Sequence, residues 1–274
     1  AKTFSSLGMT ALIPAIDHLN RLEIHPDTIT DIRRMLLTAT ARRDLCPSGR
    51  TALFVPSYTA GMALNACCHA SLTGRVSSIM SVGTFAGIER SLAFVLEQDD
   101  IDDYGRNILM KNFIHHALGR NEELDLVLQV ALEDNGYKRP PSERELPGVL
   151  AEVSDETRMH WERLDGDSAY RTEVLRTAHA NMPQAEAWFA LFDLDERIRD
   201  LVAPVLLLHG AHDDVIPPSE SKRLHDELRA AGRPSHFLAT RLLDHGDIQM
   251  GPTIMGDAWR LFRAMRFFFR HAAG

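Results

Sequence analysis

The sequence predicts one α/β domain whose mostly parallel sheet has helices on both faces and carries a helical insertion. Short apolar runs alternate along the chain with segments of helical period, which is typical of βαβ units and a parallel sheet. The runs are apolar throughout rather than at every second residue, so both faces of the sheet are expected to be buried. The chain has 274 residues, which is long enough for such a core.

The first elements are read from apolar runs and helix start signals. Residues 8–15 form a short apolar run closed by Pro14, and they predict a buried strand. Pro26 and Asp27 mark the start of a helix over residues 27–41, where apolar residues recur at helical spacing. The next elements are a strand at 51–56, a helix of small residues at 61–70 and a strand at 75–83.

The middle of the chain has a different character. Residues 88–200 are richer in charge and mostly helical in period. We interpret this block as a helical cap inserted into a core formed by residues 1–87 and 201–274. After it come a strand at 204–208, a helix at 219–231, a strand at 236–243 and a helix at 253–271.

Charge and composition exclude several classes of protein. The chain has 30 Lys and Arg against 38 Asp and Glu, a net charge of −8, which disfavours a nucleic-acid partner. Cys46, Cys67 and Cys68 form no disulfide framework, which fits a reducing compartment, and we expect Cys67 and Cys68 to pack in the core. No apolar stretch reaches the roughly 18 residues of a membrane span. The opening residues have no apolar signal-peptide core, so we expect a cytoplasmic protein.

The first candidate catalytic residue is Ser57, which stands between a predicted strand and a predicted helix in Val-Pro-Ser-Tyr-Thr-Ala-Gly. A serine on such a sharp turn projects its hydroxyl from the sheet, beside the backbone N–H groups that begin the helix. The match to G-x-S-x-G is imperfect, because Val55 stands where glycine would be easiest. The alternative is an ordinary N-cap serine, which is common at helix starts.

Two further sequence motifs follow predicted strands. His209-Gly-Ala-His212-Asp213-Asp214 comes after an apolar strand, and a carboxylate there can orient an imidazole. Turn chemistry also explains the aspartates, and a metal site on His209, His212 and Asp213 is the weaker option. Leu-Asp-His245-Gly-Asp comes after the last strand, where a histidine can exchange protons near neutral pH, although a lone histidine is more often a surface residue.

Together these phrases resemble the α/β-hydrolase superfamily over nearly the whole chain. The order Ser57, Asp213, His245 is that of these enzymes. PVLLLHGAHDDVIPPSES is similar to their acid-bearing strand and loop, FVPSYTAG to a variant nucleophile elbow, and LLDHGD to their histidine loop. The resemblance implies Ser57 as nucleophile, His245 as general base and Asp213 as the acid, with Asp214 as runner-up. It also implies the backbone N–H of Tyr58 as an oxyanion-hole donor.

The chain departs from the family near its beginning. The family places several strands and a second oxyanion donor before the elbow, whereas only residues 8–15 read as a strand before residues 51–56. Residues 1–7 look like the tail of the helix that follows the oxyanion loop. The sequence can be a fragment, the missing part can come from another chain, or the chemistry can be lost. Exposed sheet edges would favour self-association, so a homo-oligomer is a possible assembly.

The resemblance implies a serine hydrolase that cleaves a carboxylic ester or related acyl compound through an acyl-enzyme. No metal or organic cofactor is required, and the expected partner is a small-molecule acyl substrate. The alternatives are a non-catalytic binding protein of the same fold and an acyltransferase with the same triad. Six aromatic residues of the cap block are candidate pocket walls or ordinary core, namely Phe94, Phe113, Trp161, Trp188, Phe189 and Phe192.

The last predicted helix combines arginines with aromatic residues. We expect Arg260, Arg263, Arg266 and Arg270 along one side and Trp259, Phe262 and Phe269 on another. Such a helix can lie on a membrane. In this architecture we favour an apolar stripe packed on the sheet.

Overall fold

The computed structural model describes residues 9–97, 103–243 and 254–272. Its chain divides into two compact units, each described by itself below. Unit 1 consists of Ala1–Ile88 and Ala190–Gly274, and unit 2 of Glu89–Phe189.

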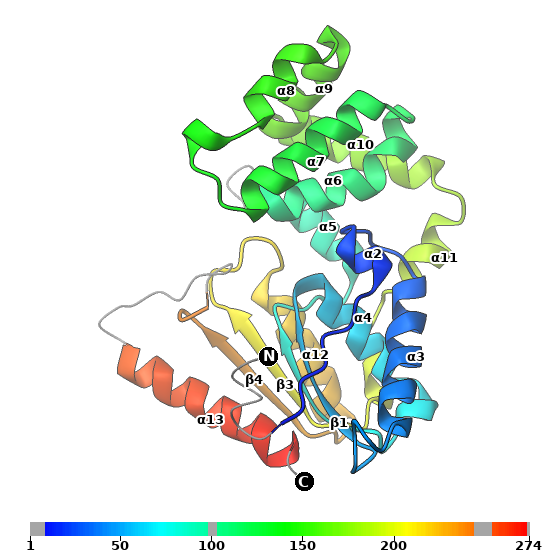
Figure 1. Ribbon diagram of the computed structural model, residues 1–274, viewed down its shortest axis with the longest axis vertical. Helices are drawn as coiled ribbons and strands as arrows, with labels where there is room; N and C mark the ends of the chain where they lie inside the picture. Colours follow the sequence, from blue (N-terminus) through cyan, green and yellow to red (C-terminus); the bar gives the residue numbers. More distant parts are fainter. Residues whose placement is uncertain (1–8, 98–102, 244–253, 273–274) are drawn as a thin grey trace. The chain divides into compact units, whose positions relative to one another are not determined.

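Unit 1 is built on a four-stranded sheet in the order β1-β2-β3-β4 (Figure 1). Every neighbouring pair in it is parallel. The mostly parallel sheet of the sequence analysis is therefore confirmed, and its four later strands lie where they were expected. The strands are β1 (Thr51–Pro56), β2 (Val76–Val82), β3 (Val205–Gly210) and β4 (Ser235–Thr240).

Helices pack on both faces of this sheet, as expected. Met80, Leu206 and Leu208 point to one face and are buried with Ala264 and Phe268 of the last helix. Side chains alternate along a strand, so Ile79 and its odd-numbered neighbours point to the opposite face. Figure 1 shows α13 on one side of the sheet and α4 and α12 on the other. The helices of unit 1 are α2 (Asp17–Asn20), α3 (Asp27–Ala41), α4 (Ser57–Cys67), α12 (Pro218–Ala230) and α13 (Ile254–Ala272).

The strand expected at residues 8–15 is wrong for the described part of that range. Residues 9–16 form neither helix nor strand, and Leu12 and Ile13 are 52% and 80% exposed. Among the described residues β1 pairs with β2 alone, so residues 9–16 do not use the other edge of β1. Residues 1–7, expected as a helix tail, lie outside the described residues.

The last helix packs on the sheet, as the sequence favoured, but with a different stripe. Ala264 and Phe268 are buried there, with Leu261 and Met265 partly buried beside them. Of the three aromatic residues expected on the packed side, Phe269 is partly buried there, whereas Trp259 and Phe262 remain exposed. Among the described helices, none is long and apolar enough to span a bilayer.

Unit 2 is a bundle of helices with its own core. Val127, Leu128 and Leu164 have no exposed surface, and they pack with Leu96 and Trp161. Of the proposed pocket walls, Phe113, Trp161 and Phe189 are buried within this unit, and Phe192 is buried within unit 1. The helices are α5 (Ile88–Glu97), α6 (Asp103–Leu118), α7 (Glu122–Gly136), α8 (Leu146–Glu152), α9 (Asp155–Gly166), α10 (Ser168–Asn181) and α11 (Ala185–Ala190).

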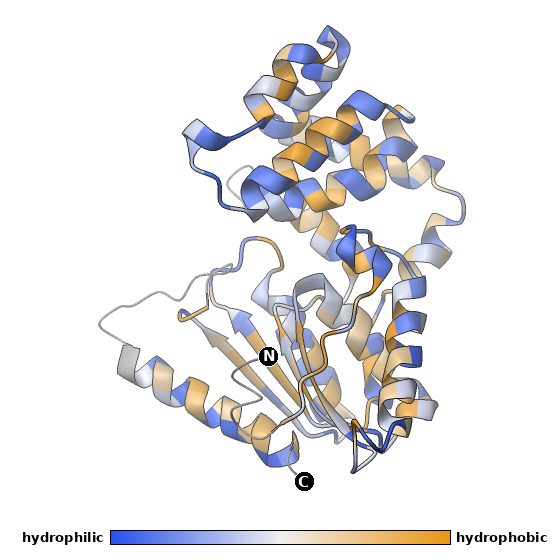
Figure 2. Ribbon diagram, viewed as in Figure 1, coloured by the Kyte–Doolittle hydropathy of each residue, from blue (hydrophilic) through white to orange (hydrophobic). Residues whose placement is uncertain are grey.

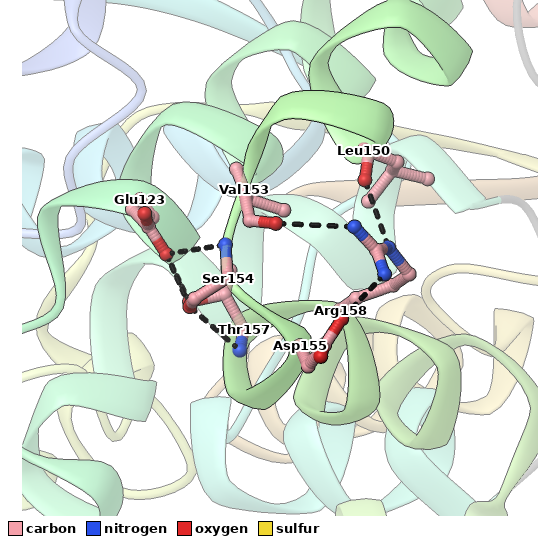
Figure 3. A network of polar contacts seen from close by, with 7 residues as sticks. All are labelled: Glu123, Leu150, Val153, Ser154, Asp155, Thr157 and Arg158. Atoms are coloured by element: carbon pink, nitrogen blue, oxygen red, sulfur yellow. Dashed lines mark hydrogen bonds and ion pairs between the residues drawn. The ribbon is translucent and has the colours of Figure 1, made fainter.

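A polar network fixes the turn between α8 and α9 (Figure 3). The Glu123 carboxylate of α7 accepts hydrogen bonds from the backbone N–H and the hydroxyl of Ser154 and from the hydroxyl of Thr157. On the other side of the turn, the Arg158 guanidinium donates to the carbonyl of Val153. These bonds satisfy backbone groups that the end of one helix and the start of the next leave without helical partners.

The Asp134 carboxylate at the end of α7 holds the segment that begins α8. It accepts the backbone N–H of Glu145 at 3.1 Å and of Leu146 at 3.0 Å, and the Arg139 guanidinium at 2.9 Å. Its side chain is only 2% exposed. Burial works to raise the pKa of this carboxyl, but the bonds from Leu146 and Arg139 outweigh it and lower the pKa.

Replacing Asp134 by Asn should therefore destabilise unit 2 at neutral pH. The loss should be about 2 kcal/mol, because a charged acceptor of buried N–H groups is removed. The folded pKa lies below the unfolded one, so the contribution is present above about pH 4 and is lost as the pH falls through the folded value. Urea unfolding of both proteins at pH 7 and at pH 3 tests this. The prediction would be contradicted if the difference in the free energy of unfolding between the wild type and Asp134→Asn were as large at pH 3 as at pH 7.

The matched control is Asp155→Asn in α9. Asp155 also pairs with an arginine, Arg158 at 2.8 Å, but its side chain is 99% exposed. An exposed ion pair contributes well under about 1 kcal/mol. This variant should leave the unfolding curve nearly unchanged at both pH values.

Candidate active site

The four strands of unit 1 end at one edge of the sheet. Pro56 is in register with Val82, Val82 with Leu208, and Gly210 with Thr240. The loops after the strands therefore begin side by side, at the carboxyl edge where parallel sheets gather their functional groups.

Ser57 is the first residue after β1, and its backbone is strained. Its φ is +55°, a left-handed conformation that costs a non-glycine residue about 1–3 kcal/mol. Pro56 before it is extended, with φ −99° and ψ 157°. The chain therefore turns sharply from strand into helix at the serine.

This geometry decides between the two interpretations of Ser57. The N-cap position of α4 is Pro56, and no side chain makes a capping hydrogen bond there. Ser57 has a left-handed backbone instead of the extended backbone of an ordinary N-cap serine, so the geometry favours the elbow interpretation. A serine at the first helical position lies beside the positive end of the helix, where backbone N–H groups favour negative charge. Tyr58, the expected oxyanion donor, is the second residue of the same helix.

A close approach between α4 and the loop after β2 fixes the helix that carries Ser57. A Cβ atom built on Gly61 would lie 2.4 Å from the ring of Phe85, so only glycine fits there. Phe85 itself is 1% exposed. The small residues after Ser57 thus let α4 lie directly against this loop.

The carboxylate of Asp213 reaches from the loop after β3 toward β2. Its Oδ1 accepts the backbone N–H of Val215 at 3.0 Å and of Ile216 at 2.9 Å. Its Oδ2 lies 3.3 Å from the position that a Cβ of Gly83 would occupy, at the end of β2. The loop of Asp213 follows β3, and Ser57 follows β1, two strand spacings of about 4.8 Å each away. The Asp213 carboxylate lies near the end of β2, the strand between them.

The structure does not support the metal interpretation of the loop after β3. His209 is fully buried, and its ring nitrogens lie 2.6 Å from the Ser221 hydroxyl and 2.7 Å from the Ile216 carbonyl. His212 is exposed. A ring with both nitrogens engaged in the core offers no ligand atom, so His209 is a structural residue that holds the loop of Asp213.

His245, the expected base, lies outside the described residues. The described chain before that segment ends at Leu243, whose carbonyl oxygen lies 2.7 Å from the Cβ position of Gly210. The Cβ of Asp213 lies 3.5 Å from the same point. The chain thus approaches His245 from beside the acid loop, and the absence of a side chain on Gly210 permits this contact.

Glu220 is a buried polar residue that the sequence analysis did not single out. Its Oε2 accepts the backbone N–H groups of Ala86 and Gly87, each at 2.9 Å, and the residue is 5% exposed. The carbonyl of Ala86 in turn accepts the N–H of Leu194 at 2.8 Å. Glu220 therefore anchors the segment that leaves unit 1 after β2. In the sequence, Glu220 stands in Pro-Pro-Ser-Glu-Ser at a predicted helix start. This position could have drawn attention to Glu220, but it does not show that the side chain is buried.

One group of described side chains could hold a metal ion. Donor atoms of His18, His25 and Asp27 all lie within 4.8 Å of one another. The His18 and His25 rings are stacked 4.3 Å apart, and Nδ1 of His18 lies 2.6 Å from Glu23. Parallel rings do not direct their lone pairs at one point, so this arrangement is better explained as a stacked pair than as a tetrahedral site.

The cysteines of α4 and its end are poor alternative nucleophiles. Burial raises the pKa of the Cys68 thiol to about 12 and raises that of Cys67 as well. Thiols that stay protonated at neutral pH do not attack carbonyl groups efficiently. Their expected packing role agrees with the burial of Cys67.

One protein family matches part of the chain. A model of the prolyl oligopeptidase family matches residues 151–270. The match covers less than half of the chain and includes Asp213. The four parallel strands, with a strained serine after the first, agree with the arrangement that the sequence resemblance implied. No curated protein sequence matches the chain significantly.

Several solved structures are similar at low sequence identity. Rv0554 from Mycobacterium tuberculosis is 17% identical, with a TM-score of 0.39 over 89% of this chain and 71% of that chain. The putative non-heme bromoperoxidase BpoC from Mycobacterium tuberculosis H37Rv is 17% identical, with a TM-score of 0.40 over 90% and 74%. An alpha/beta fold family hydrolase from Bacillus anthracis str. Sterne is 13% identical, with a TM-score of 0.41 over 89% and 73%. TM-scores this low support no inference about the site.

Substitutions at Ser57 should reveal the strained turn without any assay of activity. Ser57→Gly should be more stable to urea than Ser57→Ala by about 1 kcal/mol, because glycine adopts a positive φ without a steric cost. At Ser168, the first residue of α10, the order should reverse, since alanine is the better helix former. Equal stability of the two Ser57 variants would contradict a left-handed backbone at this position.

Removing the Glu220 anchor should be costly. Glu220→Ala leaves two buried N–H groups without their acceptor, so the free energy of unfolding should fall by about 3 kcal/mol. The control is Glu227→Ala on the same helix, where the lost partner is the exposed Arg199 and the cost should stay below about 1 kcal/mol. Similar losses in the two variants would rule out the anchoring role.

Proposed function

We propose that this chain is a serine hydrolase that cleaves a carboxylic ester or a related acyl compound. The observation that carries the proposal is Ser57, which combines a φ of +55° with a place between β1 and α4 at the carboxyl edge of the sheet. A left-handed serine is strained, and such strain persists where the surrounding structure imposes it, typically at active sites. The turn aims the hydroxyl out of the sheet beside the start of α4.

The proposed mechanism uses Ser57, His245 and Asp213. The hydroxyl oxygen of Ser57 attacks the carbonyl carbon while His245 takes the proton, and the backbone N–H of Tyr58 stabilises the oxyanion. His245 then returns the proton to the leaving alcohol, which leaves an acyl-enzyme. Water releases the acid in a second cycle of the same steps.

Contacts of the acid loop support the role of Asp213. The two N–H bonds to Oδ1 hold the carboxylate in one orientation, and Oδ2 lies 3.3 Å from the Cβ position of Gly83 at the end of β2 and 3.4 Å from Nε2 of His209. Leu243, two residues before His245 in the sequence, has its carbonyl oxygen beside Gly210 at the end of β3, close to the Cβ of Asp213.

Unit 2 is proposed as the cap that shapes the substrate pocket. The chain leaves unit 1 directly after β2 and Gly83, at the edge that carries Ser57. Glu220 and Leu194 bind the Ala86–Gly87 segment at this exit.

Substitution of the nucleophile tests the proposal. Ser57→Ala should lower kcat/KM for an aryl ester by at least about 10³-fold, because the nucleophile of the triad is removed. A fluorophosphonate probe should label the wild-type peptide that contains Ser57 and leave the variant unlabelled. The control is Ser219→Ala, which removes an exposed serine from the first turn of α12 and should hydrolyse and label like the wild type.

A non-catalytic binding protein is the second candidate. Two observations favour it: Val55 stands two residues before Ser57, and no described residue before β1 belongs to a strand that could present a second oxyanion donor. Losing one donor typically costs roughly 10²–10³ in turnover. Equal aryl-ester rates for wild type and Ser57→Ala, with no probe on Ser57, would establish this second candidate.

A further inference from the structure

We propose that the exposed face of α13 docks on the surface of an anionic lipid bilayer. This helix already has a partner for its apolar stripe, since Ala264 and Phe268 are buried against the sheet and Leu261 and Met265 pack beside them. The stripe therefore does not explain the large apolar side chains on the opposite side. The proposal concerns that opposite side and is independent of the chemistry at Ser57.

Two aromatic residues stand on the exposed side. Trp259 is 61% exposed and Phe262 is 58% exposed, and their rings stack with centroids 5.7 Å apart and planes 20° apart. Single exposed apolar residues are common, but a stacked pair on a helix whose core face is already satisfied is not explained by packing. Tryptophan and phenylalanine are side chains that amphipathic helices insert at a membrane interface.

Three arginines share this side with the aromatic pair. With about 100° of rotation per residue, Trp259, Phe262, Arg263, Arg266 and Arg270 fall within an arc of about 100°. No ion pair joins the three arginines to a carboxylate among the described residues, whereas Arg260, off this arc, lies 3.8 Å from Asp257. The arc is thus strongly basic on a chain whose net charge is −8.

The shape of this surface favours a plane over a groove-filling partner. Helix α13 has 19 residues and is therefore about 28 Å long. Figure 1 shows it on the outside of the sheet, with no described helix of unit 1 over its outer side, and Figure 2 shows hydrophobic and hydrophilic residues interspersed along it. The cavity of about 270 Å³ at the amino edge of the sheet is lined by Arg270 and His271 but by neither exposed aromatic residue. A straight ridge with two aromatic rings among arginines matches a flat surface of phosphate head groups over an apolar layer.

The direction of the helix places the aromatic pair toward the catalytic edge. Helix α13 follows β4 and returns to the amino edge, where Arg270 lines the cavity beside Arg50. Trp259 and Phe262 stand near the other end of the helix. Docking would therefore bring the carboxyl edge of unit 1 close to the bilayer.

Vesicle co-sedimentation of the full chain tests the proposal. The wild type should bind vesicles of phosphatidylcholine with about one third phosphatidylserine at least about tenfold more strongly than pure phosphatidylcholine vesicles. Arg263→Gln with Arg266→Gln should weaken binding to the anionic vesicles on the order of tenfold, because each lost cation near the surface weakens it severalfold. Trp259→Ser with Phe262→Ser should weaken it by a similar factor.

Matched controls separate this surface from general electrostatics. Arg120→Gln with Arg229→Gln removes two exposed arginines from elsewhere and leaves the same net charge as the α13 pair, so binding should stay as in the wild type. Ser57→Ala should also bind like the wild type, since docking does not depend on the nucleophile. Melting curves confirm that each variant is folded.

Three results would overturn the proposal. The first is equal wild-type binding to neutral and anionic vesicles. The second is a loss in the control arginine pair as large as that in the α13 pair. The third is that the protein binds heparin or an acidic peptide but not vesicles, and that Trp259→Ser with Phe262→Ser leaves this binding unchanged. Such a partner would need the arginine charges and not the inserted aromatic rings.

Discussion

The parallel register of the four strands in unit 1 is the constraint on which the candidate site depends. Because Pro56, Val82 and Leu208 lie in one row across the sheet, the loops after β1, β2 and β3 start from neighbouring positions. Residues as distant in the chain as Ser57 and Asp213 therefore reach the same edge without any contact between their own elements. Antiparallel pairing of any of these strands would send one of the loops to the opposite edge.

The strongest predictions from sequence were those in which local chemistry and the fold agree. Residues 51–56 form a strand as expected, because this apolar run bounded by turns pairs with β2. The helix at 27–41 has the expected bounds, since Pro26 and Asp27 mark its start independently of the rest of the fold. Ser57 could be singled out because a predicted strand, a serine and small residues follow one another in the sequence. A nucleophile elbow is recognised by this same succession.

Features that depend on distant partners could not be predicted in this way. Residues 9–16 have the composition of a strand but do not pair with β1, whose outer edge has no strand beside it among the described residues. Glu220 and His209 look like ordinary polar residues until the fold buries them against backbone groups far away in the chain. The face of α13 that packs on the sheet was misjudged because the rings of Trp259 and Phe262 suggested core, whereas the smaller Ala264 lets the helix approach.

The most direct test of the central claim is a crystal structure of the protein after reaction with a dialkyl aryl phosphate, which stops serine hydrolases at the first covalent step. The account predicts phosphorus bonded to the hydroxyl oxygen of Ser57, with the imidazole of His245 between that adduct and the carboxylate of Asp213. An unmodified Ser57, or an imidazole remote from both groups while the sheet is intact, would contradict the account.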